Sequence, residues 1–355
     1  MGSWYDEQRE AQARAYDRAQ GVLFIVRFAL LFVLATVFWR SGWSRELAAG
    51  LRAGFSFPFG WALVHGVFVA LAVFGYEAVL FPLSVMADYS LERVHGQLHI
   101  GFGLWLSGYL LSLVLEMGLA TAGFTGLYVL LRLFPSTWWI WATAAYALLV
   151  GGLGEWGPSQ LLPRVRPPVP TNDEALEEDL QRIGRAARLE INGVAWWDFE
   201  HQDGIEDVRL TGAGRQRRVV FSEWAWRKLE PREQVFLAAR HMAWHRHGAA
   251  WAVQALQVAL AAGVFLGAVA LADALARAAG LSGAAEPAAF PLLVMALFGC
   301  AALAGLAAHA VMRWLELRAD RFALEHAGGP DVLQACLQKQ FLREPFALDA
   351  PLWQV

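Results

Sequence analysis

Two histidines one helical turn apart are the residues of this chain whose spacing most directly suggests chemistry. In the run from Arg240 to His247, His241 and His245 are related as i and i+4. On a helix this spacing brings both imidazoles to one face, where they can share a metal ion. Alone, such a pair on a helix rich in Arg and Trp is more often polar surface. A metal site therefore needs a further ligand from elsewhere in the chain.

A second group of charged residues follows the last long apolar run and could supply that ligand. Glu316 is a candidate third ligand, and Asp320, one turn later, could orient a ligand imidazole from outside the metal. His309 and Arg313 precede Glu316 at helical spacing, so all four residues fall on one face, where His309 and Arg313 would line a cavity. The alternative interpretation is an ordinary charged face where a helix leaves the membrane.

The composition places these motifs in a membrane protein. Of 355 residues, 57% are hydrophobic and 17% are charged, whereas soluble domains are about 45–50% apolar and about 25% charged. The mean hydropathy is +0.37. A net charge of −3 excludes a strongly basic, nucleic-acid-binding surface. With only Cys300 and Cys336, the chain has no disulfide framework and no cysteine-based zinc module, so any metal must be held by histidine and carboxylate.

Apolar runs long enough to cross a bilayer recur along the chain. About 20 apolar residues are needed for one crossing, and five runs reach that length: 21–39, 61–86, 137–156, 249–272 and 288–312. A sixth stretch, 100–134, is too long for one crossing, and Glu116 with Gly118 offers a place to divide it. We therefore expect about seven transmembrane helices.

The charges near and within these runs predict an orientation and an interior. Arginines 40, 45 and 52 and the long polar segment would share one side, which the positive-inside rule makes cytoplasmic. Ionisable residues within membrane helices usually face a bundle interior or a wet cavity. Such residues occur throughout the predicted helices, namely Arg27, His65, Glu77, Glu116, Glu155, Asp273 and His309. An internal chamber is therefore plausible, with Glu155 and Asp273 nearer the helix ends.

The polar segments predict a small α+β unit. Prolines between residues 162 and 170 favour an extended exit from the membrane. We expect a helix capped by Thr171 or Asn172 and ending near Leu189, strands over 193–199, 207–210 and 217–221, and a helix from Pro231 to about His247. The predicted fold is mainly α: a polytopic membrane protein with a small zincin-like α+β domain. Its parts are 1–158 (N-terminal bundle), 159–248 (metallopeptidase-like segment), 249–312 (two helices) and 313–355 (second motif).

With both motifs in view, the chain resembles the membrane zinc metallopeptidases of the CAAX prenyl protease type 1 class and their heat-shock membrane protease relatives. There the motifs read H-E-x-x-H and E-x-x-A-D; here they are His241-Met242-Ala243-Trp244-His245 and Glu316-Leu317-Arg318-Ala319-Asp320. Segments 81–96, 162–167, 211–220 and 229–245 are similar as well, so the resemblance spans about residues 20 to 335. It implies seven spans around a large chamber, with zinc held by His241, His245 and Glu316 and with Asp320 behind them.

Three departures from that family bear on activity. Met242 stands where the family has the glutamate that takes a proton from zinc-bound water, and general acid–base catalysis is typically worth about 10²–10⁴ in rate. The strand before the glycine turn reads Asp207-Val208-Arg209 where the family usually has Asn-Ala-Tyr. The segment after the second motif contains no His-Pro pair, and a terminal oxyanion-stabilising arginine is missing too. The resemblance therefore identifies a degenerate member of the family with no catalytic base.

These observations leave three hypotheses. The first is a zinc-binding pseudoprotease that serves as a binding or accessory membrane protein, in contact with the lipid bilayer and with a lipidated or membrane peptide or a membrane-complex partner. The second is an active zinc endopeptidase with an unconventional base, and the third is a metal-free structural subunit. We rank them in that order. Frequent Ala, Arg, Gly and Trp suggest a bacterial cytoplasmic membrane protein, and nothing points to nucleic acid.

Overall fold

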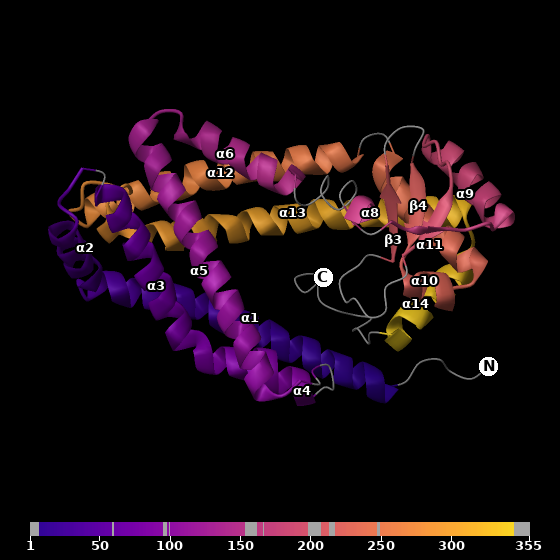
Figure 1. Cartoon of the computed structure of the whole chain (residues 1–355), viewed down its shortest axis with the longest axis horizontal. Coiled ribbons are helices and arrows are strands. Elements are labelled where there is room, and N and C mark those ends of the chain that lie inside the picture. Colours follow the sequence, from indigo (N-terminus) through magenta and orange to yellow (C-terminus); the bar gives the residue numbers. More distant parts are fainter. Residues whose placement is uncertain are drawn as a thin grey trace. The chain divides into compact units, whose positions relative to one another are not determined.

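The chain forms two compact units in the computed structural model. The structure describes residues 7–343 apart from 59, 95–97, 99, 153–161, 166, 198–206, 213–216 and 247–248. Within that range, the membrane unit comprises residues up to 143 and residues 261–304, and the polar unit comprises residues 144–260 and 305 onward. Figure 1 labels the elements of both units.

Long apolar helices make up the membrane unit and extend from it. Its elements are α1 (Glu7–Arg40), α2 (Trp43–Gly54), α3 (Gly60–Ser84), the π-helix η1 (Val85–Leu91), α4 (Glu92–Val94), α5 (Phe102–Leu133), α6 (Trp138–Leu149), α12 (Ala249–Ala278), the short 3₁₀ helix η5 (Pro287–Ala289) and α13 (Phe290–His326). Five stretches of these helices are long and apolar enough to span a membrane: Arg14–Arg40, Gly60–Val94, Phe102–Leu133, Trp251–Ala278 and Pro287–His326. A shorter apolar helix covers Trp138–Gly152. The prediction of an integral membrane protein is thereby confirmed.

One helix, α5, corrects the predicted division of residues 100–134. The structure has a single helix of 32 residues here, and both Glu116 and Gly118 lie inside it. Glycine is common in membrane helices, and a helix longer than the bilayer is accommodated by tilt. The division into two short spans was therefore wrong. Over the described residues the count is five long helices and one short one, so seven spans are not confirmed.

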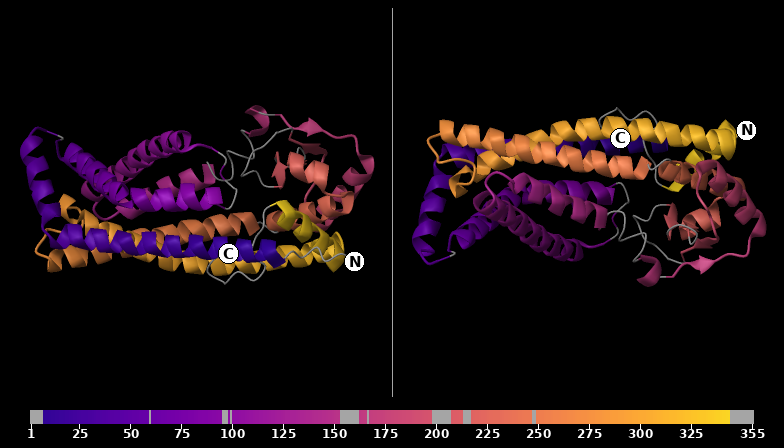
Figure 2. Two further views of the ribbon diagram at one scale, coloured as in Figure 1. Left: turned by 90° about the horizontal axis from the view of Figure 1, so that it is seen from below. Right: turned by 90° about the horizontal axis from the view of Figure 1, so that it is seen from above.

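The core of the membrane unit lies where α3, α5, α12 and α13 supply apolar side chains. Phe68 and Val69 of α3 are fully buried beside Tyr128 of α5 and Leu293 of α13. Figure 2 shows α2 across the end of this unit, where it packs against α3 and η5. These contacts bring the start of α3 and the connection between α12 and α13 to the same end of the unit.

Several ionisable residues predicted inside the spans have polar partners there. The Arg27 guanidinium of α1 lies 2.8 Å from the Asp88 carboxylate of η1. The Tyr109 hydroxyl donates to Glu77 at 3.4 Å. Asp273 pairs with Arg277 at 2.8 Å near the end of α12, as expected for a residue close to a helix end. Glu155 lies outside the described residues.

The polar unit is built on a four-stranded mixed sheet. Its strands are β1 (Val169–Pro170), β2 (Val194–Trp196), β3 (Val208–Thr211) and β4 (Arg218–Phe221), in the order β1-β2-β4-β3. β2 and β4 are parallel, and β3 pairs antiparallel with β4 at one edge. All three predicted strands are thus confirmed; β2 and β4 each begin one residue later than predicted, and β3 is shifted by one residue. Residues 162–165, predicted to be extended, form the single helical turn α8 (Leu162–Val165).

Two helices cover this sheet, and their ends follow the capping signals of the sequence. The first, α9 (Glu174–Ala187), begins after Asp173, whose side chain accepts a hydrogen bond from the Leu176 N–H at 3.0 Å. The N-cap is thus Asp173 rather than Thr171 or Asn172. The second, α11 (Pro231–His245), has Pro231 in its first turn and a capping box between Glu230 and Glu233. It ends at His245, and His247 lies outside the described residues.

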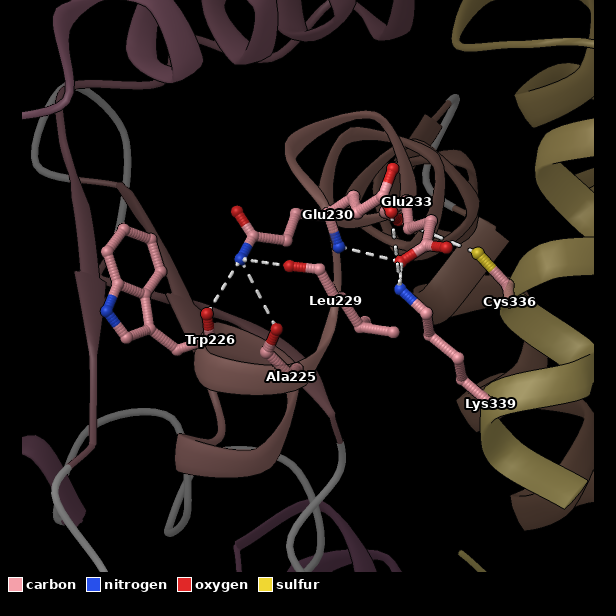
Figure 3. A network of polar contacts seen from close by, with 8 residues as sticks. Ala225, Trp226, Leu229, Glu230, Glu233, Cys336 and Lys339 are labelled. Atoms are coloured by element: carbon pink, nitrogen blue, oxygen red, sulfur yellow. Dashed lines mark hydrogen bonds and ion pairs between the residues drawn. The ribbon is translucent and has the colours of Figure 1, made fainter. Parts of the chain in front are cut away.

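A polar network holds the last helix, α14 (Pro330–Arg343), on the start of α11 (Figure 3). The Glu233 carboxylate is buried, accepts the Glu230 N–H at 2.7 Å and pairs with Lys339 at 2.6 Å. The Cys336 thiol donates to the Glu233 carbonyl oxygen at 3.8 Å. The short helix α10 (Glu223–Lys228) joins the network through Gln234, which donates to the carbonyls of Trp226 and Leu229. The network fixes the helix that carries both histidines.

Candidate functional site

The two histidines lie together on α11, as their spacing predicts. The ring centroids of His241 and His245 are 5.4 Å apart, and both side chains are partly exposed. Arg246 follows as the C-cap, with its guanidinium 5.2 Å from the centre of the Phe322 ring of α13. The last turns of α11 and the α13 segment around Phe322 are therefore neighbours within the polar unit.

The His241 imidazole is neutral at physiological pH. Burial lowers the pKa of His241 to about 3, and the neighbouring His245 and Arg209 add to the lowering. A neutral imidazole keeps a free nitrogen lone pair, which is the form that binds a metal ion. Arg209 lies on the edge strand β3, so its positive charge reaches the pair from the sheet.

Helix α13 carries the second motif as a direct continuation of the last apolar run. This helix is continuous from Phe290 to His326, so Glu316 and Asp320 lie on the same helix as His309 and Arg313, as their spacing predicts. Asp320, the predicted outer partner of a ligand histidine, has its Oδ1 2.6 Å from Arg240 Nε. Arg240 directly precedes His241, so this ion pair joins the two motif-bearing helices. The sequence did not predict this pairing, although Arg240 directly precedes the first motif and Asp320 ends the second.

The other residues predicted on the same face of α13 each have different surroundings. The exposed His309 places its Nδ1 2.7 Å from the Gly305 carbonyl oxygen of its own helix. Arg313 has a buried Nη1 atom without a hydrogen-bond partner among the described residues. Glu316 is partly buried. The helical stripe is present, but its members have separate contacts and do not converge on one site.

The described side chains do not fit a closed metal site as they are placed. Among the described residues, no group of three or more His, Cys, Asp or Glu side chains lies close enough to hold a metal ion. The neutral imidazoles of His241 and His245 suit zinc in their chemistry. Glu316, however, does not join them in such a group, and the nearby Arg209 charge opposes a cation.

Met242 occupies a core position. Its side chain is fully buried and packs in the cluster that includes Ile183, Phe221, Phe236 and Phe322. A thioether has no proton to accept or donate in acid–base catalysis. His241 and His245 can accept hydrogen bonds or bind an ion. Met242, which lies between them in the sequence and is buried in the core, cannot activate water.

The membrane unit contains a separate open cavity of about 740 Å³ between α3 and α5. Small residues on the two helices leave this space: Ala62, Gly66 and Ala70 on α3, and Gly118, Ala122 and Gly126 on α5. Its volume is in the range of about 300–1,000 Å³ that is common for ligand sites. Its lining is almost entirely apolar, so it offers space for hydrocarbon rather than for a polar group.

Comparison with known proteins gives a consistent picture of the fold. Residues 2–152 match the family model described as CAAX prenyl protease N-terminal, five membrane helices. The crystal structure of S. mikatae Ste24p is similar at a TM-score of 0.71 over 99% of this chain and 86% of that one, with 15% sequence identity. No match is found among curated protein sequences.

The sequence similarity to the CAAX prenyl proteases thus covers residues 2–152, and the similarity to Ste24p extends to the fold of nearly the whole chain. The family resemblance read from the two motifs is thus confirmed, and so is the mainly helical, Ste24p-like fold with its small sheet. At 15% identity the Ste24p structure establishes the fold of this chain alone. Met242 marks the departure of this chain from the His-Glu-x-x-His motif of the CAAX prenyl proteases.

Proposed function

We propose that this protein is a non-hydrolysing member of the CAAX prenyl protease class, a membrane protein that binds a ligand or supports a partner. The observation that carries the proposal is the fully buried Met242 between the two histidines. The family's base would have to stand at this position, and here an apolar side chain packs into the core. The Ste24p-like fold supplies the scaffold, and function follows from the site rather than from the fold.

Zinc is the ion that we propose for the site, with His241, His245 and Glu316 as ligands. Two neighbouring imidazoles, one of them held neutral, support this assignment. Binding would require Glu316 to approach the imidazoles more closely than in this structure, because the three do not form a ligand group here. Asp320 would then act through its ion pair with Arg240, by holding α11 against α13.

A metal-free structural subunit is the second candidate, and a specific observation favours it. Arg209 brings a positive charge close enough to lower the pKa of His241, and such a charge weakens cation binding. In this case the histidines and the Arg240–Asp320 pair serve only to pack α11 against α13. Both candidates share the loss of hydrolysis, and they differ in metal content.

The ligand we propose is a lipidated or membrane peptide. The apolar cavity between α3 and α5 supports this class, because its small lining residues leave room for a hydrocarbon chain. We also propose that the protein lies in a bacterial inner membrane and that its polar unit is on the cytoplasmic side. If the five long helices and the short helix over 138–152 all cross, the N-terminal arginines 9, 14 and 18 share a side with the polar unit. That side then carries the arginine excess.

Metal analysis of the purified full chain, combined with a peptidase assay, tests the proposal. We expect about one zinc per chain, lost in His241→Ala and retained in His326→Ala, a matched histidine that contacts Phe322 on α13. We also expect no cleavage of a prenylated peptide. Zinc near zero in both variants and in the wild type would favour the structural subunit. Cleavage that a chelator abolishes would overturn the proposed function.

A further inference from the structure

A buried histidine of the membrane unit joins the connection between α12 and α13 to the start of α3. His65 is 8% exposed and lies between two aromatic rings, with centroid distances of 6.1 Å to Trp61 and 4.3 Å to Tyr128. Its Nδ1 lies 2.7 Å from the Trp61 carbonyl oxygen, one turn earlier in α3. Its Nε2 lies 3.2 Å from the carbonyl oxygen of Ala285, which is 220 residues away in sequence.

Both partners of this imidazole can only accept hydrogen bonds. A neutral imidazole has one N–H group and one lone pair, whereas the imidazolium ion has two N–H groups. The protonated ring can therefore donate to both carbonyls, and the neutral ring can donate to only one while its lone pair faces the other. We propose that His65 is a pH-sensitive latch, whose protonated ring ties the α12–α13 connection to α3 and whose neutral ring releases one of the two bonds.

The charged groups around the latch are engaged with one another. On the connection itself, Glu286 accepts hydrogen bonds from the Ser282 N–H at 2.9 Å and lies 3.5 Å from Arg52 of α2. From α12, Asp273 pairs with Arg277 and accepts the Ala284 N–H at 3.1 Å. The Asp273 and Glu286 carboxylates near the α12–α13 connection are thus neutralised by arginines rather than by His65.

From α5, Tyr128 contacts the histidine and Arg132 contacts the neighbouring Trp61. The Tyr128 ring is tilted by 47° against the imidazole, and its hydroxyl is buried without a hydrogen-bond partner among the described residues. The guanidinium of Arg132 lies 4.4 Å from the centre of the Trp61 ring. The two carbonyl acceptors are therefore what distinguishes the protonated ring from the neutral ring at this position.

Release of the latch opens the connection locally. Ala285 is exposed, so water can replace the lost bond at its carbonyl. The hydrogen bonds of Asp273 and Glu286 hold the rest of the connection, because both carboxylates stay ionised across the pH range in which histidine titrates. The expected change is thus confined to the backbone around Ala285 and does not unfold the membrane unit.

Amide hydrogen exchange of the full chain in detergent, followed by mass spectrometry, tests the latch. Exchange of peptides covering residues 281–289 is compared at about pH 5.5 and about pH 8. Residues 134–137, at the end of a helix, serve as the internal reference for the intrinsic pH dependence of exchange. We expect protection to fall by about tenfold at the higher pH, because a charged donor makes the stronger hydrogen bond. In His65→Phe, which keeps the ring, protection should be low at both pH values.

Two results would overturn the latch. Equal protection of residues 281–289 at both pH values in the wild type is one, and an unchanged pH difference in His65→Phe is the other. A second variant, His65→Gln, covers the case in which the phenylalanine variant does not fold. Its amide has no charge to lose, so its protection should not depend on pH; a pH difference equal to that of the wild type would contradict the proposal.

Discussion

The Arg240 guanidinium lies 2.6 Å from the Asp320 carboxylate, and this ion pair joins the helix of the two histidines to the helix of the second motif. The two side chains are 39% and 30% exposed, so solvent screens the attraction and a modest interaction is expected. In a double-mutant cycle with Arg240→Met and Asp320→Asn, we expect a coupling energy of about 0.5–1 kcal/mol. Thermal unfolding in detergent measures it.

The control for this cycle is the exposed pair Arg182–Asp179 of α9, at 2.6 Å. Both of its side chains are more than half exposed, so its coupling should be near zero. A coupling at Arg240–Asp320 no larger than that of the control would show that the ion pair does not hold α11 against α13.

Met242 defines a second prediction. Met242→Glu would bury a carboxylate at a fully buried site in an apolar cluster, where an unpaired charge is strongly unfavourable. We expect a loss of about 3 kcal/mol or more in the free energy of unfolding and no gain of peptidase activity. Met242→Leu preserves the volume and should cost less than about 1.5 kcal/mol. A stable glutamate variant that cleaves peptide would mean that position 242 faces the site after all.

Lys339 provides a third prediction, because its amine neutralises the buried Glu233 carboxylate at 2.6 Å. Glu233 is 5% exposed in its side chain, and Lys339→Ala would leave it with the Glu230 N–H as its remaining partner in this network. We expect a loss of about 1–3 kcal/mol in unfolding free energy, with most of it recovered in Lys339→Arg. Limited proteolysis should release α14 first; an unchanged melting temperature would contradict the role assigned to this network.

The two thiols should differ in reactivity, and Cys336 carries the fourth prediction. Burial raises the pKa of Cys336 to about 12, and the nearby Glu233 charge adds to this rise. At about pH 8 only about one thiol in ten thousand is the reactive thiolate. In a Cys300→Ala background, we expect no alkylation of Cys336 by iodoacetamide in the native protein and full alkylation after denaturation. Rapid native labelling would show that α14 is not docked.

The sequence predicted most of the elements, because their signals are local. Pro231, the capping acids and the histidine spacing placed α11, and alternating apolar residues placed β2, β3 and β4. The division of α5 was wrong because Glu116 and Gly118 are tolerated inside one membrane helix. The predicted orientation in the membrane rested on the same division. With one crossing fewer before the polar segment, the N-terminus falls on the same side as that segment instead of the opposite side.

The site was less predictable because it depends on contacts between distant residues. Nothing in the spacing of residues 240–247 shows that Arg240 pairs with Asp320, and the Asp207-Val208-Arg209 departure did not reveal that the charge of Arg209 reaches His241. The burial of Met242 follows from the packing of α11 against α9 and α13 rather than from its own identity. Convergence of His241, His245 and Glu316 on a metal stays a prediction.

The most direct test of the central claim is a cleavage assay on the zinc-supplemented full chain in bilayer nanodiscs, with a prenylated CAAX peptide as substrate. We expect no product above the level of His241→Ala, because the residue at position 242 cannot activate water. Product that forms in the wild type, disappears with a chelator and is lost in His241→Ala would show that this protein is a working peptidase and would contradict the account.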